Sequence, residues 1–153
     1  MFFRTHLVIT IFFILLFLQY IQSPIVFLPV SVLATALPDI DTKFSKIGHY
    51  KISKIFNFFV KHRGITHSFS FLAILSLLIF LFFKEILLSF VFAYSLHLIL
   101  DALTISGITP FYPLKLKIKG RMKTGGITET LLFVSFLLID SFLIFSKIYL
   151  IVK

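Results

Sequence analysis

Histidine and aspartate residues at short spacings stand beside long apolar runs in this chain. In "YSLHLILDALT", His97 and Asp101 are four residues apart, so in a helix they share one face about one turn apart. Such a pair can bind one metal ion together, or the aspartate can hold the imidazole in one tautomer. Ionisable groups inside apolar segments are costly and usually functional. We therefore place this pair at the centre of a candidate site.

The stretch "ALPDIDT" carries two carboxylates at the end of another apolar run. Asp39 and Asp41 follow Pro38, which disfavours helix at Leu37 and helps to end the segment. Two carboxylates separated by one residue can both reach a divalent ion from a turn. The plainer alternative is a polar helix stop, in which Asp41 or Thr42 caps a following helix.

The stretch "KHRGITHSFSF" places two histidines and an arginine just before a third apolar run. The glycine of this motif permits a tight turn, so His62 and His67 can point to a common centre. Arg63 offers a planar fork suited to phosphate or carboxylate. The alternative is a basic loop that ends in a helix N-cap at Thr66 or Ser68.

Three further ionisable residues lie on the first and last apolar runs. His6 opens the first run and Glu129, in "GGITETLL", opens the last. Alone, His6 reads as an interfacial residue and Glu129 as an acid favoured by the helix dipole. Asp140 lies midway along the last run, and the pattern gives it no partner. Apart from Asp140, the candidates come from five segments and yet fall at one predicted membrane face.

The donor set predicts a divalent metal ion. The chain has no cysteine, which excludes thiolate sites, and three to five His, Asp and Glu ligands suit Zn²⁺, or else Mn²⁺ or Fe²⁺. An open coordination position would make such a site hydrolytic. The predicted metal ligands are His6, Asp39, His67, His97, Asp101 and Glu129. The predicted catalytic residues are His62, Arg63 and Asp41, with Lys61 or Lys123 as further anion-binding candidates.

The elements that must position these residues are membrane helices. The composition is 59% hydrophobic with 22 Phe and a mean hydropathy of +1.07, far above the usage of soluble domains. We expect one all-α domain over residues 1–153, a polytopic bundle of about four to five transmembrane helices. The apolar segments are 5–21, 24–38, 68–83, 86–101 and 128–150. The second is short and carries two prolines, which predicts a kink or partial insertion.

The basic residues predict the orientation of the bundle. Of the 15 Lys and Arg residues, 12 lie near the N-terminus or in the loops 40–67 and 102–127. The positive-inside rule then makes the N-terminus and both basic loops cytoplasmic in a multi-pass cell (inner) membrane protein. We read the first segment as a retained helix rather than a cleaved signal peptide. The first loop is either a basic amphipathic helix on lipid headgroups or a solvated linker. No nucleic-acid partner is expected.

The motifs "THL", "LPDID", "HRGITHS" and "HLILDALTISGITPFYP", with a late glutamate after Thr-Gly, resemble the YdjM-like membrane-bound proteins. The predicted activity of that family is metal-dependent hydrolysis, and one bacterial branch is described as LexA-binding and inner-membrane-associated. The LexA association is not carried over, because no residue of these motifs encodes it. The resemblance implies metal-site residues at His6, Asp39, Asp41, His62, His67, His97 and Asp101, with Glu129 a weaker match. "PDI", the histidine pair and HxxxD also resemble zinc-dependent phospholipase C.

The leading hypothesis is therefore a membrane-embedded, metal-dependent hydrolase at the cytoplasmic face. Its expected substrate is a phosphoester of an amphipathic, lipid-like molecule. A transporter or proton-handling protein is the first alternative, and it predicts polar groups throughout the membrane depth. A non-enzymatic scaffold whose basic loops bind lipid is the second, and it gives no reason for clustered His and Asp.

Overall fold

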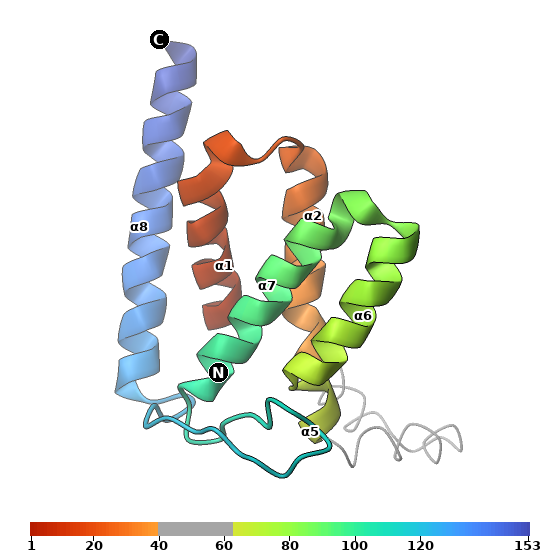
Figure 1. Ribbon diagram of the computed structural model, residues 1–153. Helices are drawn as coiled ribbons and strands as arrows, with labels where there is room; N and C mark the ends of the chain where they lie inside the picture. Colours follow the sequence, from red (N-terminus) through yellow and green to blue (C-terminus); the bar gives the residue numbers. More distant parts are fainter. Residues whose placement is uncertain (40–62) are drawn as a thin grey trace, which may run out of the picture.

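Helices dominate the structure, a computed structural model that describes residues 1–39 and 63–153 (Figure 1). Helix α1 (Phe3–Phe17) continues as the 3-10 turn η1 (Leu18–Tyr20), and α2 (Pro24–Ala36) ends in the 3-10 turn η2 (Leu37–Asp39). The remaining helices are α5 (Arg63–Thr66), α6 (Phe69–Phe82), α7 (Lys84–Ala102) and α8 (Ile127–Val152). The predicted all-α bundle is confirmed, and its five apolar segments match α1, α2, α6, α7 and α8 within a few residues.

Three of these helices are long and apolar enough to cross a membrane. They span Phe3–Tyr20, Lys84–Ala102 and Ile127–Leu150, whereas Pro24–Asp39 and Phe69–Phe82 are apolar but shorter. Helix α2 begins at Pro24, where a missing N–H costs nothing, and it continues past Pro29. The amphipathic helix considered for the first basic loop lies outside the described residues.

Small side chains let α2 and α7 pack closely, and this pair forms the centre of the bundle. Ser31 and Ala34 of α2 and Ser89 and Ala93 of α7 are all buried. Residues of this size allow two helix backbones to approach each other inside a membrane. The hydroxyl of Ser31 donates a hydrogen bond of 3.5 Å to the carbonyl of Ser89. This contact fixes α7 beside α2.

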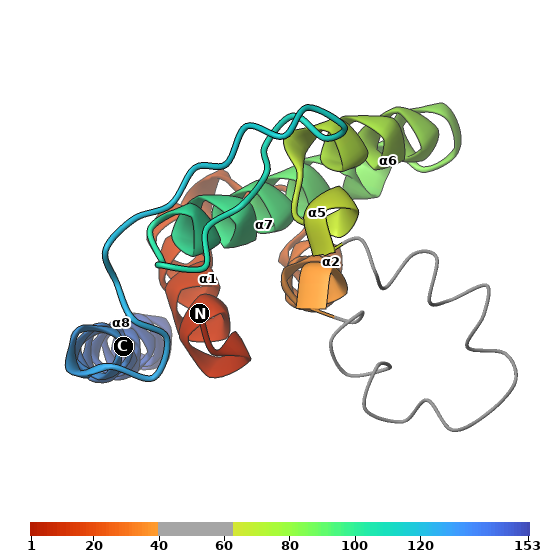
Figure 2. The ribbon, with the colours of Figure 1, turned by 90° about the horizontal axis from the view of Figure 1, so that it is seen from below.

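Helix α8 stands at one edge of the bundle and packs mainly on α1 (Figures 1 and 2). On the opposite side, α6 packs against α7. Many large apolar side chains of α6 and α8 are exposed, such as Phe82 and Phe142. These surfaces suit contact with lipid rather than water.

The segment between α7 and α8 runs beneath the bundle and back again (Figure 2). It folds on itself through two backbone hydrogen bonds of 2.9 Å between Ile108 and Ile118. The carbonyl of Pro110 accepts a hydrogen bond of 2.8 Å from the N–H of Phe69 at the start of α6. Gly107 has φ +63°, and a Cβ there would lie 2.3 Å from the carbonyl oxygen of Ile118. A glycine is required for this close approach.

Candidate metal centre

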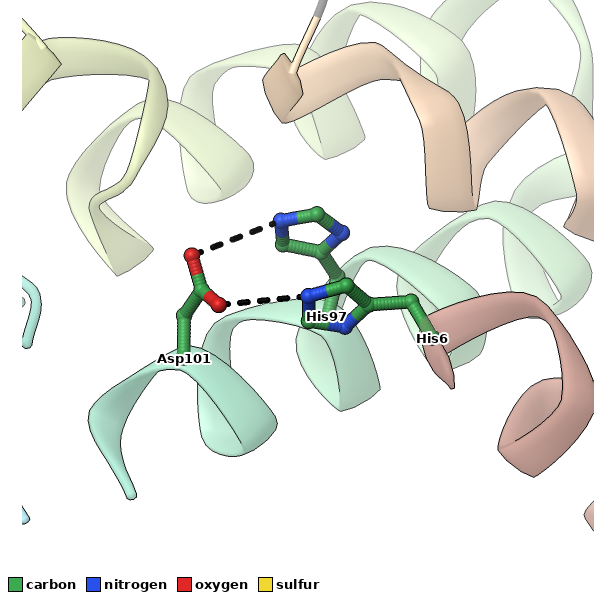
Figure 3. Close-up of side chains that lie close together, drawn as sticks. All are labelled: His6, His97 and Asp101. Atoms are coloured by element: carbon green, nitrogen blue, oxygen red, sulfur yellow. Dashed lines mark hydrogen bonds and ion pairs between the residues drawn. The ribbon is translucent and has the colours of Figure 1, made fainter. Parts of the chain in front are cut away.

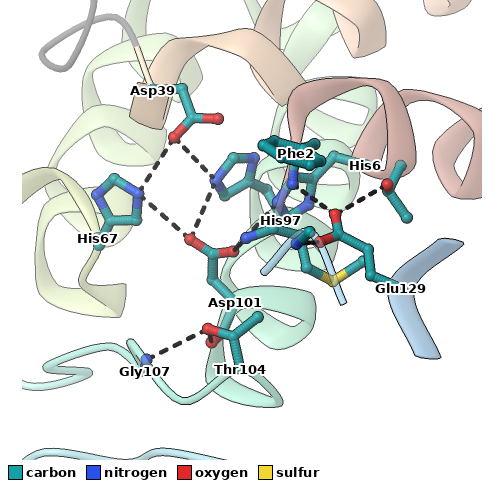
Figure 4. Close-up of polar contacts among 12 residues, drawn as sticks. Phe2, His6, Asp39, His67, His97, Asp101, Thr104, Gly107 and Glu129 are labelled. Atoms are coloured by element: carbon teal, nitrogen blue, oxygen red, sulfur yellow. Dashed lines mark hydrogen bonds and ion pairs between the residues drawn. The ribbon is translucent and has the colours of Figure 1, made fainter. Parts of the chain in front are cut away.

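One end of the bundle gathers residues from four helix ends (Figure 4). His6 lies near the start of α1, Asp39 ends η2, and His67 lies between α5 and α6. His97 and Asp101 occupy the last turns of α7. Of the two predicted N-caps, Thr66 and Ser68, it is Ser68 that caps α6: its hydroxyl accepts a hydrogen bond of 3.2 Å from the N–H of Phe71. Because Ser68 is the cap, His67 directly precedes the start of α6, and the cap fixes the position of His67 relative to that helix.

Four side-chain atoms face one another in this cluster. Nε2 of His67 lies 3.6 Å from Oδ1 of Asp39 and 3.5 Å from Oδ2 of Asp101. Nε2 of His97 lies 4.0 Å from the same Asp39 oxygen and 3.8 Å from the same Asp101 oxygen. Two nitrogens and two carboxylate oxygens therefore alternate at the corners of a four-sided arrangement, which appears as a diamond of dashed lines in Figure 4. We call these four residues the donor ring.

The backbone of α2 fixes the tautomer of His97. Nδ1 of His97 lies 2.9 Å from the carbonyl oxygen of Thr35. Because a carbonyl only accepts, this nitrogen carries the hydrogen, and in the neutral imidazole Nε2 presents its lone pair. That lone pair faces the carboxylates of Asp39 and Asp101. Lone pairs and carboxylates repel unless a cation lies between them.

His6 approaches the ring from the side of α1. Its Nε2 lies 3.2 Å from Oδ1 of Asp101 (Figure 3). The imidazoles of His6 and His97 are stacked, with centroids 3.9 Å apart and planes 10° from parallel. The amino group of Met1 also contacts Oδ1 of Asp101. These contacts occupy one oxygen of Asp101 and leave Oδ2 directed at His67 and His97.

Most of the cluster is buried. His6 and His97 are fully buried, and His67 and Asp101 are 3% and 6% exposed. Within residues 1–39 and 63–153, Nδ1 of His6 and Nε2 of both His67 and His97 have no hydrogen-bond partner. Buried polar atoms rarely lack partners unless a ligand, water or ion satisfies them. The unpaired nitrogens of His67 and His97 are the two that belong to the donor ring.

These residues fit a divalent metal ion. In a tetrahedral site with bonds of about 2.1 Å, ligand atoms lie about 3.4 Å apart; the four His–Asp contacts of the donor ring are slightly longer, at 3.5 Å to 4.0 Å. Two overlapping groups can each offer three ligand atoms within 4.8 Å of one another. One contains His6, His97 and Asp101, and the other contains Asp39, His67 and His97. Imidazole and carboxylate donors without thiolate suit Zn²⁺, Mn²⁺ or Fe²⁺.

Glu129, predicted as a metal ligand, lies outside these groups and ties the chain together instead. One of its carboxylate oxygens accepts hydrogen bonds from the N–H of Phe2 at 2.6 Å and the hydroxyl of Thr5 at 3.0 Å. The other accepts the N–H of Gly125 at 2.6 Å. The side chain is 2% exposed. Glu129 therefore joins the start of α8 to the start of α1, behind His6.

The other predicted site residues are placed less fully. Asp41 and His62 lie outside the described residues, and of Arg63 the structure describes only its place as the first residue of α5. Asp140 is buried in α8, 11 residues beyond Glu129 and so about 16 Å further along the helix. It belongs to neither metal-binding group.

Two residues without ionisable groups, Thr104 and Gly107, shape the turn that follows Asp101. The hydroxyl of Thr104 donates to the carbonyl of Asp101 at 2.7 Å and accepts the N–H of Gly107 at 3.3 Å. The spacing HxxxDxxTxxG already contains both residues. The carbonyl of Thr35, which orients His97, is different: a backbone acceptor leaves no signal in the sequence.

A cavity of about 300 Å³ opens beside the donor ring. Its lining residues are His67, Asp101, Ser106, Gly107, Ile108, Thr109 and Lys117. Two members of the ring therefore form part of its wall, and the turn after α7 forms the rest. A small polar molecule in this cavity would contact the ring directly.

Comparisons with known proteins agree with the membrane fold. The family described as YdjM inner membrane protein matches residues 1–152. A relative from Bacillus subtilis (strain 168), "Uncharacterized protein YvsG", is 30% identical over 115 residues, which cover 71% of this chain and 72% of the relative. No solved structure matches. Because the family covers nearly every residue, including all four residues of the donor ring, the chain belongs to the YdjM inner membrane protein family.

Proposed function

We propose that this membrane protein is a metal-dependent hydrolase that acts on a phosphoester of an amphipathic, lipid-like substrate at the cytoplasmic face. The observation that carries the proposal is the donor ring, in which the fixed lone pair of His97 faces two carboxylates. The resemblance to a family of predicted hydrolases supports the reaction class. Three helices of membrane length support a substrate that is itself anchored in the membrane, because such a substrate would reach a site at the end of the bundle.

His67, His97, Asp39 and Asp101 would hold the metal ion. When bound, a divalent cation acts as a Lewis acid on a phosphoryl oxygen and makes water a stronger nucleophile at neutral pH. The proposed reaction adds water across the P–O ester bond, so the phosphate gains the oxygen of the water and the leaving alcohol gains a proton.

The protein's own groups would orient and desolvate the reactants. His6 holds one oxygen of Asp101 and keeps the other directed at the ring. The burial of His67, His97 and Asp101 strengthens the charge interactions of the ring. Asp41 or His62 is the proposed proton acceptor, and Arg63 the proposed phosphate contact.

Metal content tests the proposal first. Protein purified in detergent should hold about one equivalent of metal per chain by elemental analysis, and His97→Ala and Asp101→Asn should each lose it. Asp140→Asn is the matched control, because it also removes one buried carboxylate but lies outside the ring. Stoichiometric metal in wild-type protein without turnover on a broad panel of lipid phosphoesters would contradict the hydrolase.

Asp140 favours a second candidate, a transporter or proton-handling protein. Its Oδ1 is buried in a membrane-length helix and has no hydrogen-bond partner within the described residues. Ionisable groups at such depth often mark ion pathways. Ion flux into proteoliposomes that Asp140→Asn abolishes would support this candidate, while equal flux in both proteins would count against it.

A further inference from the structure

The cavity beside the donor ring is lined by residues of two chemical kinds. His67 and Asp101 belong to the donor ring, and Ser106, Thr109 and Lys117 belong to the segment between α7 and α8. Lys117 is the cation among its lining residues. A ligand that fills the cavity therefore contacts two residues of the donor ring as well as a lysine and two hydroxyl-bearing residues of the loop.

The charge of the loop favours an anion at this end. Residues 102–126 include five Lys or Arg and no Asp or Glu. In the ring, the two carboxylates of Asp39 and Asp101 are balanced when a divalent cation is bound. The local field then comes mainly from the loop, and it is positive.

The fold holds Lys117 at the cavity. The neighbouring Ile118 is paired with Ile108 through both backbone hydrogen bonds, and Ile108 itself is 3% exposed. Gly107 allows this pairing because a Cβ there would strike the carbonyl of Ile118. The position of Lys117 thus depends on the same turn that follows Asp101 in the chain.

We propose that Lys117, together with Ser106 and Thr109, binds the phosphate group of the substrate beside the donor ring. This inference rests on the proposed function, and it names the group through which the substrate is recognised. The phosphate belongs either to a lipid headgroup or to a water-soluble ester, since both present the same phosphate group to the cavity. A lysine contributes a compact charge with three donors, which suits a phosphate oxygen without bidentate geometry.

Binding of inorganic phosphate tests the role of Lys117 without requiring turnover. Isothermal titration of metal-loaded protein in detergent should show that Lys117→Gln binds phosphate about tenfold or more weakly than wild type, as expected for loss of a charge-assisted hydrogen bond. Lys117→Arg should retain affinity within about threefold. Lys115→Gln is the matched control, because it removes the same charge from the same loop but Lys115 does not line the cavity.

The outcomes separate this inference from the proposed function. Unchanged phosphate affinity in Lys117→Gln at full metal content would overturn the inference alone, and so would an equal loss in Lys115→Gln. Wild-type protein that binds no metal would overturn the proposed function, whatever Lys117 does. Competition by glycerol 3-phosphate and by dihexanoyl phosphatidic acid then identifies the source: tighter binding of the lipid supports a headgroup, and equal binding supports a water-soluble ester.

Discussion

His6 offers the sharpest test of how the site is built, because it was predicted as a ligand and the structure gives it a hydrogen bond to another ligand. Its Nε2 lies 3.2 Å from Oδ1 of Asp101, and its ring stacks on His97. We expect His6 to position these two residues rather than to bind the metal ion. Two substitutions separate its contacts. His6→Phe keeps an aromatic ring for the stack and removes the hydrogen bond, whereas His6→Asn keeps a donor and removes the ring.

The expected loss of metal affinity depends on which contacts of His6 each substitution keeps. Loss of a partner that orients a metal ligand lowers metal affinity by about 10- to 100-fold, which is about 1.4 to 2.7 kcal/mol. His6→Phe should fall in this range, because Oδ1 of Asp101 loses one of its two partners among the described residues and keeps only the amino group of Met1, while Oδ2 still faces His67 and His97. His6→Asn should fall by less than about tenfold if its amide reaches Asp101.

Competition with a chromophoric chelator measures Zn²⁺ affinity, and elemental analysis measures stoichiometry. A positioning role predicts weaker binding with one metal ion per chain retained. Loss of stoichiometric metal in both variants would refute the reasoning and return His6 to the ligand set. Wild-type affinity in His6→Phe would refute it in the other direction, since the hydrogen bond to Asp101 would then be irrelevant.

Three further predictions concern stability, the turn and pH. Glu129→Gln weakens three hydrogen bonds to a carboxylate, one of them buried and two partly buried, and should lower the free energy of unfolding by about 2 to 4 kcal/mol; thermal unfolding in detergent should show a lower Tm with metal content unchanged, and lost metal with unchanged Tm would contradict this role. Gly107→Ala forces a Cβ against the carbonyl of Ile118 and should weaken phosphate binding at least as much as Lys117→Gln, measured by the same titration; unaltered binding would show that the turn does not hold the cavity. Metal affinity should fall as pH is lowered, because imidazole and carboxylate groups bind a metal ion only in their deprotonated forms; a profile that stays flat in chelator competition down to strongly acidic pH would count against a site built from histidine and aspartate.

The parts of the molecule that follow local rules were predictable from the sequence. Apolar runs of membrane length gave the helices, and the four-residue spacing of His97 and Asp101 placed both on one face of α7. His6, Asp39 and His67 were predicted to lie near that pair. Each stands at or near the end of an apolar segment, and those ends fall at the same predicted membrane face.

The rest depends on contacts between distant residues, which spacing does not encode. Glu129 was predicted as a metal ligand from its residue type and its place at the start of a helix. Its oxygens instead accept hydrogen bonds from Phe2, Thr5 and Gly125. The tautomer of His97 is set by the carbonyl of Thr35, 62 residues away. Residue spacing does not distinguish Lys117 from the other cations of the loop. The backbone pairing of Ile108 with Ile118 brings Lys117 to the cavity.

The origin of the donor ring in separate helices has a consequence for how the protein is assembled. Asp39 leaves the ribosome long before Asp101, so the site is incomplete until α7 has entered the membrane beside α2. The four residues lie at or near helix ends, where water can solvate each side chain until the helices pack together. A metal ion would then close the ring last, and it would lock the relative positions of helices that small side chains alone had brought together.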